Sequence, residues 1–126
     1  HPEVLILDEP TAGLDPKGRD EILDEISALH REHHMTIVLV SHSMEDIARY
    51  ADRIMVMNHG EKIFDAPPKE VFRHYKELEA IGLAAPQITY IVQGLKEHGV
   101  PIADDITTVT EARDAILHLL GKDERP

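Results

Sequence analysis

The chain has 126 residues, a formal net charge of −11 at pH 7 and no cysteine. Its negative field repels phosphate backbones and anionic lipid headgroups, which argues against nucleic acid as a partner. Nothing favours disulfides, and the apolar runs VLIL and TIVLV are far shorter than the roughly 20 residues that span a bilayer, so we expect a cytosolic protein without direct membrane insertion.

The first predicted element is a short strand that runs directly into acidic residues. VLIL, residues 4 to 7, is a continuous apolar run, the pattern of a strand covered on both faces in a parallel sheet. Asp8 and Glu9 follow, and because neighbouring side chains on a strand point to opposite faces, these carboxylates need different roles. Asp15 and Pro16 then predict a helix start, with the carboxylate as cap and proline at the first helical position.

A helix and a second strand complete one parallel crossover. Apolar residues at helical spacing predict a helix over residues 16 to 31, and TIVLVSH predicts a strand over residues 36 to 42. Strand, helix and strand in this order form a right-handed parallel unit, so both strands end at the edge where α/β folds place ligands. Asp8, Glu9 and His42 are therefore expected to gather there.

The rest of the chain changes from strands to helices. A short helix over residues 44 to 51 precedes a β-hairpin, predicted over residues 53 to 58 and 61 to 66. Helices are then predicted over residues 68 to 78, from Pro86 to Gly99, and from Thr108 to Gly121. We expect two parts: an α/β part over residues 1 to 66 and a helical part over residues 67 to 126.

The last of these helices is predicted to bury an apolar face, and its first turn carries a capping-box pattern at Thr108 and Glu111. The residues expected to face inward are Ala112, Ala115, Ile116, Leu119 and Leu120. The apolar faces of the last two helices could form an intramolecular core or a dimer seam. Because these two helices are too small a unit for a generous core of their own, we expect association with a partner.

The three polar residues at the strand ends suit metal-assisted phosphoryl chemistry. Asp8 can anchor Mg²⁺, Glu9 can orient or deprotonate a water, and His42 can bond a terminal phosphate. The simplest alternative is a polar strand end without function. It is disfavoured because proline, glycine and a second aspartate follow the pair at fixed places.

LILDEP followed by TAGLDP, and later a strand ending in SH, resembles the second half of an ABC-transporter nucleotide-binding domain. The resemblance implies an α/β fold that is a partial P-loop NTPase sheet with a C-terminal helical extension, and it implies ATP and Mg²⁺ as cofactors. It makes Glu9 the general base and His42 the switch histidine at the nucleotide. By the same resemblance Asp8 acts on Mg²⁺ through water, and Asp15 lies at a dimer interface beside the partner's active site.

The tail resembles one subfamily. IFDAPPKEVF resembles the hairpin and helix of many importers, and GLAAPQITYIVQGLKEHGVP with ITTVTEARDAIL resembles the helical extension of energy-coupling factor ATPases, which serve vitamin, cobalt and nickel uptake. This implies an ATP-hydrolysing subunit at the inner face of the cell membrane. Its partners would be a second, identical or related ATPase subunit, a transmembrane coupling component and a substrate-binding membrane component, which selects the substrate.

The family pattern is incomplete within these residues. No G-x-x-x-x-G-K-[ST] loop or LSGGQ-like segment occurs, and the chain opens at His1 directly before the first strand, so we expect an excerpt that is inactive alone. In the family the phosphate-loop strand lies between the strand ending at His42 and the one beginning at Arg53. Its absence predicts a slot closed by direct pairing, by strand exchange with a second copy, or by an upstream part of a longer chain.

Two alternatives remain open. The chain could be a non-catalytic dimerisation or regulatory module in which the α/β part is merely retained, or it could come from an ATPase of another ABC importer class. An ABC ATPase of DNA repair or translation is disfavoured, because such proteins would be expected to show coiled-coil arms or a basic face.

Overall fold

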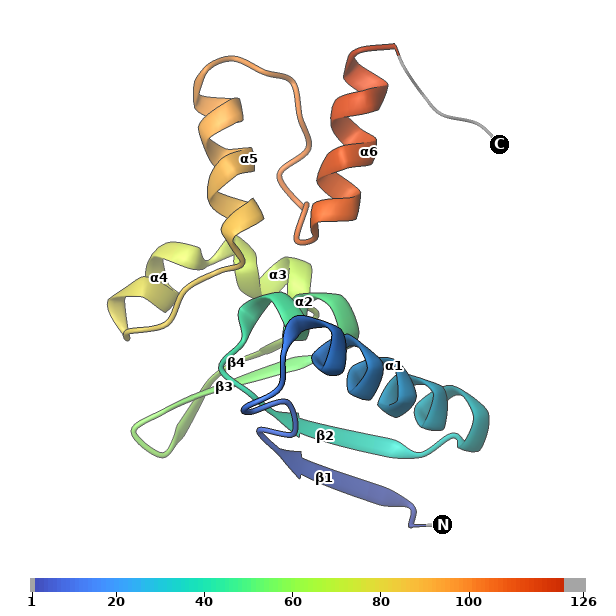
Figure 1. Cartoon of the computed structure of the whole chain (residues 1–126). Helices are drawn as coiled ribbons and strands as arrows, with labels where there is room; N and C mark the ends of the chain where they lie inside the picture. Colours follow the sequence, from blue (N-terminus) through green and yellow to red (C-terminus); the bar gives the residue numbers. More distant parts are fainter. Residues whose placement is uncertain (1, 122–126) are drawn as a thin grey trace. The chain divides into compact units, whose positions relative to one another are not determined.

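The computed structural model describes residues 2 to 121. They divide into two compact units, one ending at Ser43 and one beginning at Met44. Figure 1 shows the elements of both units along the chain. None of the helices in this described part has the length and apolar composition that crossing a bilayer requires.

The first unit is the strand–helix–strand crossover. Its elements are β1 (Val4–Asp8), α1 (Pro16–His33) and β2 (Thr36–Val40). The strands pair in parallel, with Val4 opposite Thr36 and Asp8 opposite Val40, so their carboxyl ends lie at one edge as predicted. β2 ends two residues earlier than the sequence indicated, because residues 41 to 43 have no strand geometry.

The expectation that the first strand is covered on both faces is wrong for the described chain. Exposed and half-buried residues alternate along both strands, and α1 packs on β2 on one side (Figure 1). Ile6 and Val4 remain 68% and 52% exposed. The physical reason is that this unit supplies one helix, which can cover one face of a sheet only.

Over the described residues 44 to 121, the second unit combines a hairpin with five helices. Its elements are α2 (Met44–Tyr50), β3 (Ile54–Asn58), β4 (Glu61–Ala66), α3 (Pro68–Arg73), α4 (Tyr75–Ala80), α5 (Gln87–Glu97) and α6 (Val109–Leu119). β3 and β4 pair antiparallel, as predicted, through a turn in which His59 and Gly60 have φ of 49° and 78°. Two consecutive left-handed residues match the twist of a tight hairpin.

The helix predicted over residues 68 to 78 is two helices. The N–H of His74 bonds to the carbonyl of Val71, three residues back, which ends α3 in a tight turn, and α4 then begins at Tyr75. The imidazole of His74 stacks on Phe64 with ring centroids 5.2 Å apart, and it contacts Glu77 at 2.8 Å. These contacts hold the break in place.

Two separate hydrophobic clusters stabilise the second unit. The first joins the hairpin to α2, α3 and α4 and contains Ala48, Ile54, Val56, Val71, Phe72, Leu78 and Ala85. The second lies between α5, the segment after it and α6, and contains Val92, Ile102, Ile106 and Ala112. The hairpin thus shares a core with the helices that follow it, and the division after residue 66 stays a prediction.

The inward face predicted for the last helix is only partly buried. Ala112 is 2% exposed, whereas Ile116, Leu119 and Leu120 are 37%, 41% and 62% exposed. The second cluster contains Ala112, with Ala115 packed against it, whereas the three more exposed residues are not part of it.

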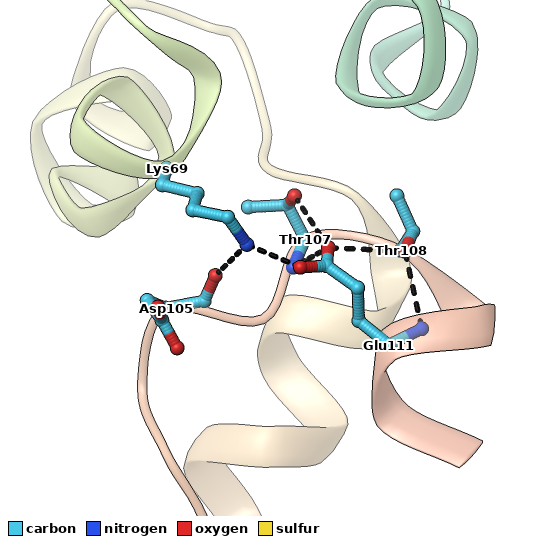
Figure 2. Close-up of polar contacts among 5 residues, drawn as sticks. All are labelled: Lys69, Asp105, Thr107, Thr108 and Glu111. Carbon is cyan, nitrogen blue, oxygen red and sulfur yellow. Dashed lines mark hydrogen bonds and ion pairs between the residues drawn. The ribbon is translucent and has the colours of Figure 1, made fainter. Parts of the chain in front are cut away.

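A polar cluster fastens α3 to the start of α6 (Figure 2). Lys69 donates to the carbonyl oxygen of Asp105 at 2.7 Å and pairs with the Glu111 carboxylate. Glu111 Oε1 accepts from the hydroxyls of Thr107 and Thr108 at 3.2 and 3.0 Å, and the Glu111 N–H donates to Thr108 Oγ1. Thr108 caps α6 as predicted, but the Glu111 carboxylate returns to the Thr107 N–H at 3.3 Å and not to the Thr108 N–H of a standard capping box.

The described strands form two separate two-stranded sheets, β1–β2 and β3–β4. Within residues 2 to 121, the strands that flank the predicted slot, β2 and β3, therefore do not pair directly. Strand exchange with a second copy, and closure by an upstream part of a longer chain, stay predictions.

Candidate functional site

The candidate site begins where β1 ends. Asp8 is the last residue of the strand and is exposed. Glu9 extends the pairing by one bond, since its N–H donates to the carbonyl of Val40 at 2.8 Å, yet its φ is 48°. A left-handed conformation at a residue with a β-carbon costs about 1–3 kcal/mol and is concentrated at functional sites. The strained turn therefore marks Glu9 as a candidate for function.

A tight loop carries the chain from Glu9 to α1. The N–H of Ala12 bonds to the Glu9 carbonyl, and Gly13 takes a φ of 79°, which glycine adopts without strain. Asp15 then caps α1 by accepting from the N–H of Gly18 at 2.8 Å. A β-carbon at Gly18 would lie 2.8 Å from the same carboxylate oxygen, so glycine leaves room for the cap.

Glu9 and His42 are in direct contact, although they come from different strand ends. His42 Nδ1 lies 2.6 Å from Glu9 Oε1. Because an ionised carboxylate can only accept, we assign the proton to Nδ1, which leaves Nε2 to face outward. The His42 side chain is 86% exposed and the Glu9 side chain 34% exposed. The pair is thus accessible to a ligand.

The carboxylates of Asp8 and Asp15 do not join this pair. Within residues 2 to 121, the Asp8 carboxylate has no hydrogen-bond or ion-pair partner, and Asp15 uses its carboxylate on the helix cap. Of the four site residues predicted from sequence, the structure brings Glu9 and His42 together and leaves Asp8 with a free carboxylate at the end of β1.

The carboxylate at the end of β1 fits a magnesium ion that is held mainly by waters and by the phosphate oxygens of a bound ligand. Among the described residues, no group of three or more histidine, cysteine, aspartate or glutamate side chains could hold a metal by itself. Mg²⁺ commonly takes one or two carboxylates and fills its other positions with waters and phosphate oxygens. The exposed, unpaired carboxylate of Asp8 meets that requirement.

The sequence reasoning missed the residues that surround His42. Arg19 Nη2 donates to Ser43 Oγ at 3.0 Å, and the N–H of Ser43 donates to Ser41 Oγ at 3.0 Å. The available signal was a pair of serines flanking His42 and an arginine one turn after Asp15. Pairing between positions so far apart cannot be read from either segment alone.

Known proteins are similar to nearly all of this chain, although no family model matches it. The energy-coupling factor transporter ATP-binding protein EcfA2 of Clostridium tetani is 58% identical over 120 residues, which are 95% of this chain and 42% of that protein. The protein of the same name from Clostridium perfringens is 54% identical over 119 residues, 94% of this chain and 42% of its own length. The chain thus spans about 42% of the length of these relatives.

A solved structure is similar in fold. It is CbiO1 of Clostridium perfringens, described as part of the ABC transporter complex CbiONQ, and it superposes with a TM-score of 0.55 at 38% identity. The match covers 73% of this chain and 37% of CbiO1. The chain is therefore homologous to part of the energy-coupling factor transporter ATP-binding proteins, and its fold is a partial ABC ATPase α/β fold with helices at its C-terminal side.

Proposed function

We propose that this chain is part of a longer ATP-binding subunit of an energy-coupling factor importer and contributes the residues that act on the terminal phosphate of ATP during hydrolysis. The observation that supports this most is the 2.6 Å contact between Glu9 and His42, made from two parallel strand ends. The names of the relatives support the ligand and the transport role.

In the proposed mechanism Glu9 is the general base, since a carboxylate on a strained, accessible turn can take a proton from an attacking water. The Nδ1 contact with Glu9 orients the His42 ring, so that Nε2 can donate to an oxygen of the terminal phosphate when the ring carries a proton on both nitrogens. Asp8 would hold Mg²⁺ through water, and the ion would neutralise charge on the phosphate oxygens. Asp15 would lie at the interface with a second subunit.

The assembly belongs to the same proposal. A second ATPase subunit, identical or related, would complete two shared ATP sites, and a transmembrane coupling component and a substrate-binding membrane component would join them at the cytoplasmic face of the membrane. The similarity to CbiO1, described as part of a CbiONQ complex, supports membrane partners. The transported substrate stays open, because in this scheme a membrane component selects it.

Replacement of Glu9 tests the catalytic assignment. In the longer subunit, Glu9→Gln should lower the ATP hydrolysis rate by about 10²–10⁴-fold, since the amide cannot accept the proton. The matched control is Glu25→Gln, an exposed glutamate on α1, which should leave the rate unchanged. Hydrolysis by Glu9→Gln at the parent rate would remove Glu9 from catalysis and favour the alternative of a non-catalytic module.

A further inference from the structure

Neither regular secondary structure nor packing fixes the short segment that carries His42. β2 ends at Val40, and residues 41 to 43 have no regular backbone geometry. The His42 side chain is 86% exposed, so packing does not fix it either. The position of His42 against Glu9 therefore depends on hydrogen bonds made by the residues on either side of it.

Those hydrogen bonds lead to α1. Ser43 donates its N–H to Ser41 Oγ at 3.0 Å, which folds the backbone around His42. Ser43 Oγ in turn accepts from Arg19 Nη2 at 3.0 Å in a half-buried contact. A guanidinium is a planar group with donors in fixed directions, so it restrains an acceptor more tightly than a lysine ammonium does.

Arg19 lies at the capped start of α1. Its backbone N–H bonds to the carbonyl of Asp15 at 2.9 Å, and Asp15 caps the same turn through Gly18. One helical turn thus carries Asp15 at its start and Arg19 four residues later, on neighbouring positions of the helix surface. A displacement of Asp15 would move Arg19, and with it the segment of His42.

We propose that Arg19 is a positioning residue that holds His42 against Glu9 by its hydrogen bond to Ser43. Through this bond, the first turn of α1 links Asp15 to His42. The catalytic consequence rests on the proposed function, whereas the positioning does not. Arg19 reaches the segment of His42 through the hydrogen bond that its Nη2 donates to Ser43 Oγ.

The positioning is tested in the 126-residue chain by nitrogen-detected NMR of the His42 ring, identified by its loss in His42→Gln. Arg19→Met should shift the Nδ1 signal that reports the bond to Glu9, and Ser43→Ala should give the same change. The two substitutions together should change the signal no more than either does alone, since each breaks the same hydrogen bond between Arg19 and Ser43. Arg19→Lys should restore part of the parent signal.

The chain offers a matched control on the same helix. Arg31 donates to Ser27 Oγ at 3.1 Å, an arginine–serine contact of the same kind four residues apart on α1. Arg31→Met should leave the His42 signal unchanged. Where Arg19→Met fails to fold, Ser43→Ala, which removes one hydroxyl, decides the result. An unchanged Nδ1 signal in a folded Arg19→Met or Ser43→Ala chain would overturn the proposal.

Hydrolysis by the longer subunit separates the two claims. Arg19→Met should lower kcat by about 10-fold or more with little change in KM, because misplacement of a catalytic group affects the transition state rather than binding. A larger effect on KM than on kcat would overturn the positioning role. Full activity of Glu9→Gln would overturn the proposed function, while the NMR result would still decide the positioning.

Discussion

Among single residues, Asp15 combines a structural task with a proposed functional one. Its carboxylate accepts from the Gly18 N–H at 2.8 Å and so starts α1. The same side chain is exposed, as a residue at a subunit interface would have to be in the isolated chain. The two tasks make different demands, since a cap needs an acceptor and not a charge.

Replacement of Asp15 separates these tasks. Asp15→Ala should lower the free energy of unfolding of the 126-residue chain by about 1 kcal/mol through loss of the cap, whereas Asp15→Asn should retain most of it. Urea denaturation followed by circular dichroism measures both. Equal destabilisation by asparagine and alanine would show that the charge of Asp15, and not its hydrogen bond, stabilises α1.

The encounter of Glu9 with His42 could be predicted, because two apolar runs joined by a helix predict parallel strands whose ends coincide. The strained φ of Glu9 and the hydrogen bond from Arg19 to Ser43 could not be predicted. Both arise from loop geometry that forms only after the strands have paired, and neither glutamate nor arginine carries a local signal for it.

At the scale of elements, Glu111 determines how α6 is attached to α3. Burial raises the pKa of its carboxyl, but hydrogen bonds from Lys69, Thr108 and the Thr107 N–H outweigh burial and hold the pKa below its usual range. A carboxyl with a lowered pKa in the folded state stabilises that state above its unfolded pKa, about 4.3 for glutamate. This stabilisation is lost as the pH falls through the folded value.

The pH dependence of Glu111→Gln tests this attachment. The variant should be less stable than the parent at about pH 7, and the gap should narrow below the unfolded pKa of about 4.3 and close as the pH falls through the lowered folded pKa, below which the parent carboxyl is itself protonated. Urea midpoints across this range measure the gap. Glu97→Gln, an exposed position on α5, is the control and should follow the parent throughout. A gap that is constant with pH would contradict the account.

Helix and strand positions were largely predictable, whereas helix breaks and burial were not. The turn at His74 depends on the stack with Phe64 and the contact with Glu77, and of these only the nearby Glu77 could be seen in the helical pattern. The apolar face of α6 shows helical spacing over its whole length, but Leu119 is 41% exposed and belongs to neither of the two hydrophobic clusters. Periodicity predicts which residues share a face, and neighbours decide whether that face is buried.

At the scale of the whole molecule, the open face of the β1–β2 sheet has the composition of a buried surface. Ile6 and Val38, neighbours in the pairing of the strands, are 68% and 36% exposed. The sequence predicted burial on both sides because such apolar runs occur in sheets that helices cover on both faces. Only one of those layers lies within the described residues.

The nucleotide site of these 126 residues is incomplete, and this gives a prediction for the binding of ATP. Its 126 residues contain no phosphate-binding loop, so most backbone donors for a triphosphate are absent. Isothermal titration of the 126-residue chain with MgATP should therefore detect no binding in the micromolar range. The longer subunit under identical conditions is the control, and micromolar binding by the short chain would contradict the proposal.

The most direct measurement of the central claim is a double-mutant cycle of Glu9→Gln and His42→Ala in the longer subunit, followed by steady-state ATP hydrolysis. If the two side chains act as one unit on the terminal phosphate, each substitution slows hydrolysis by about 10²-fold or more, and the double variant is hardly slower than the slower single one. Hydrolysis at the parent rate in either single variant, or fully additive losses, would contradict the account.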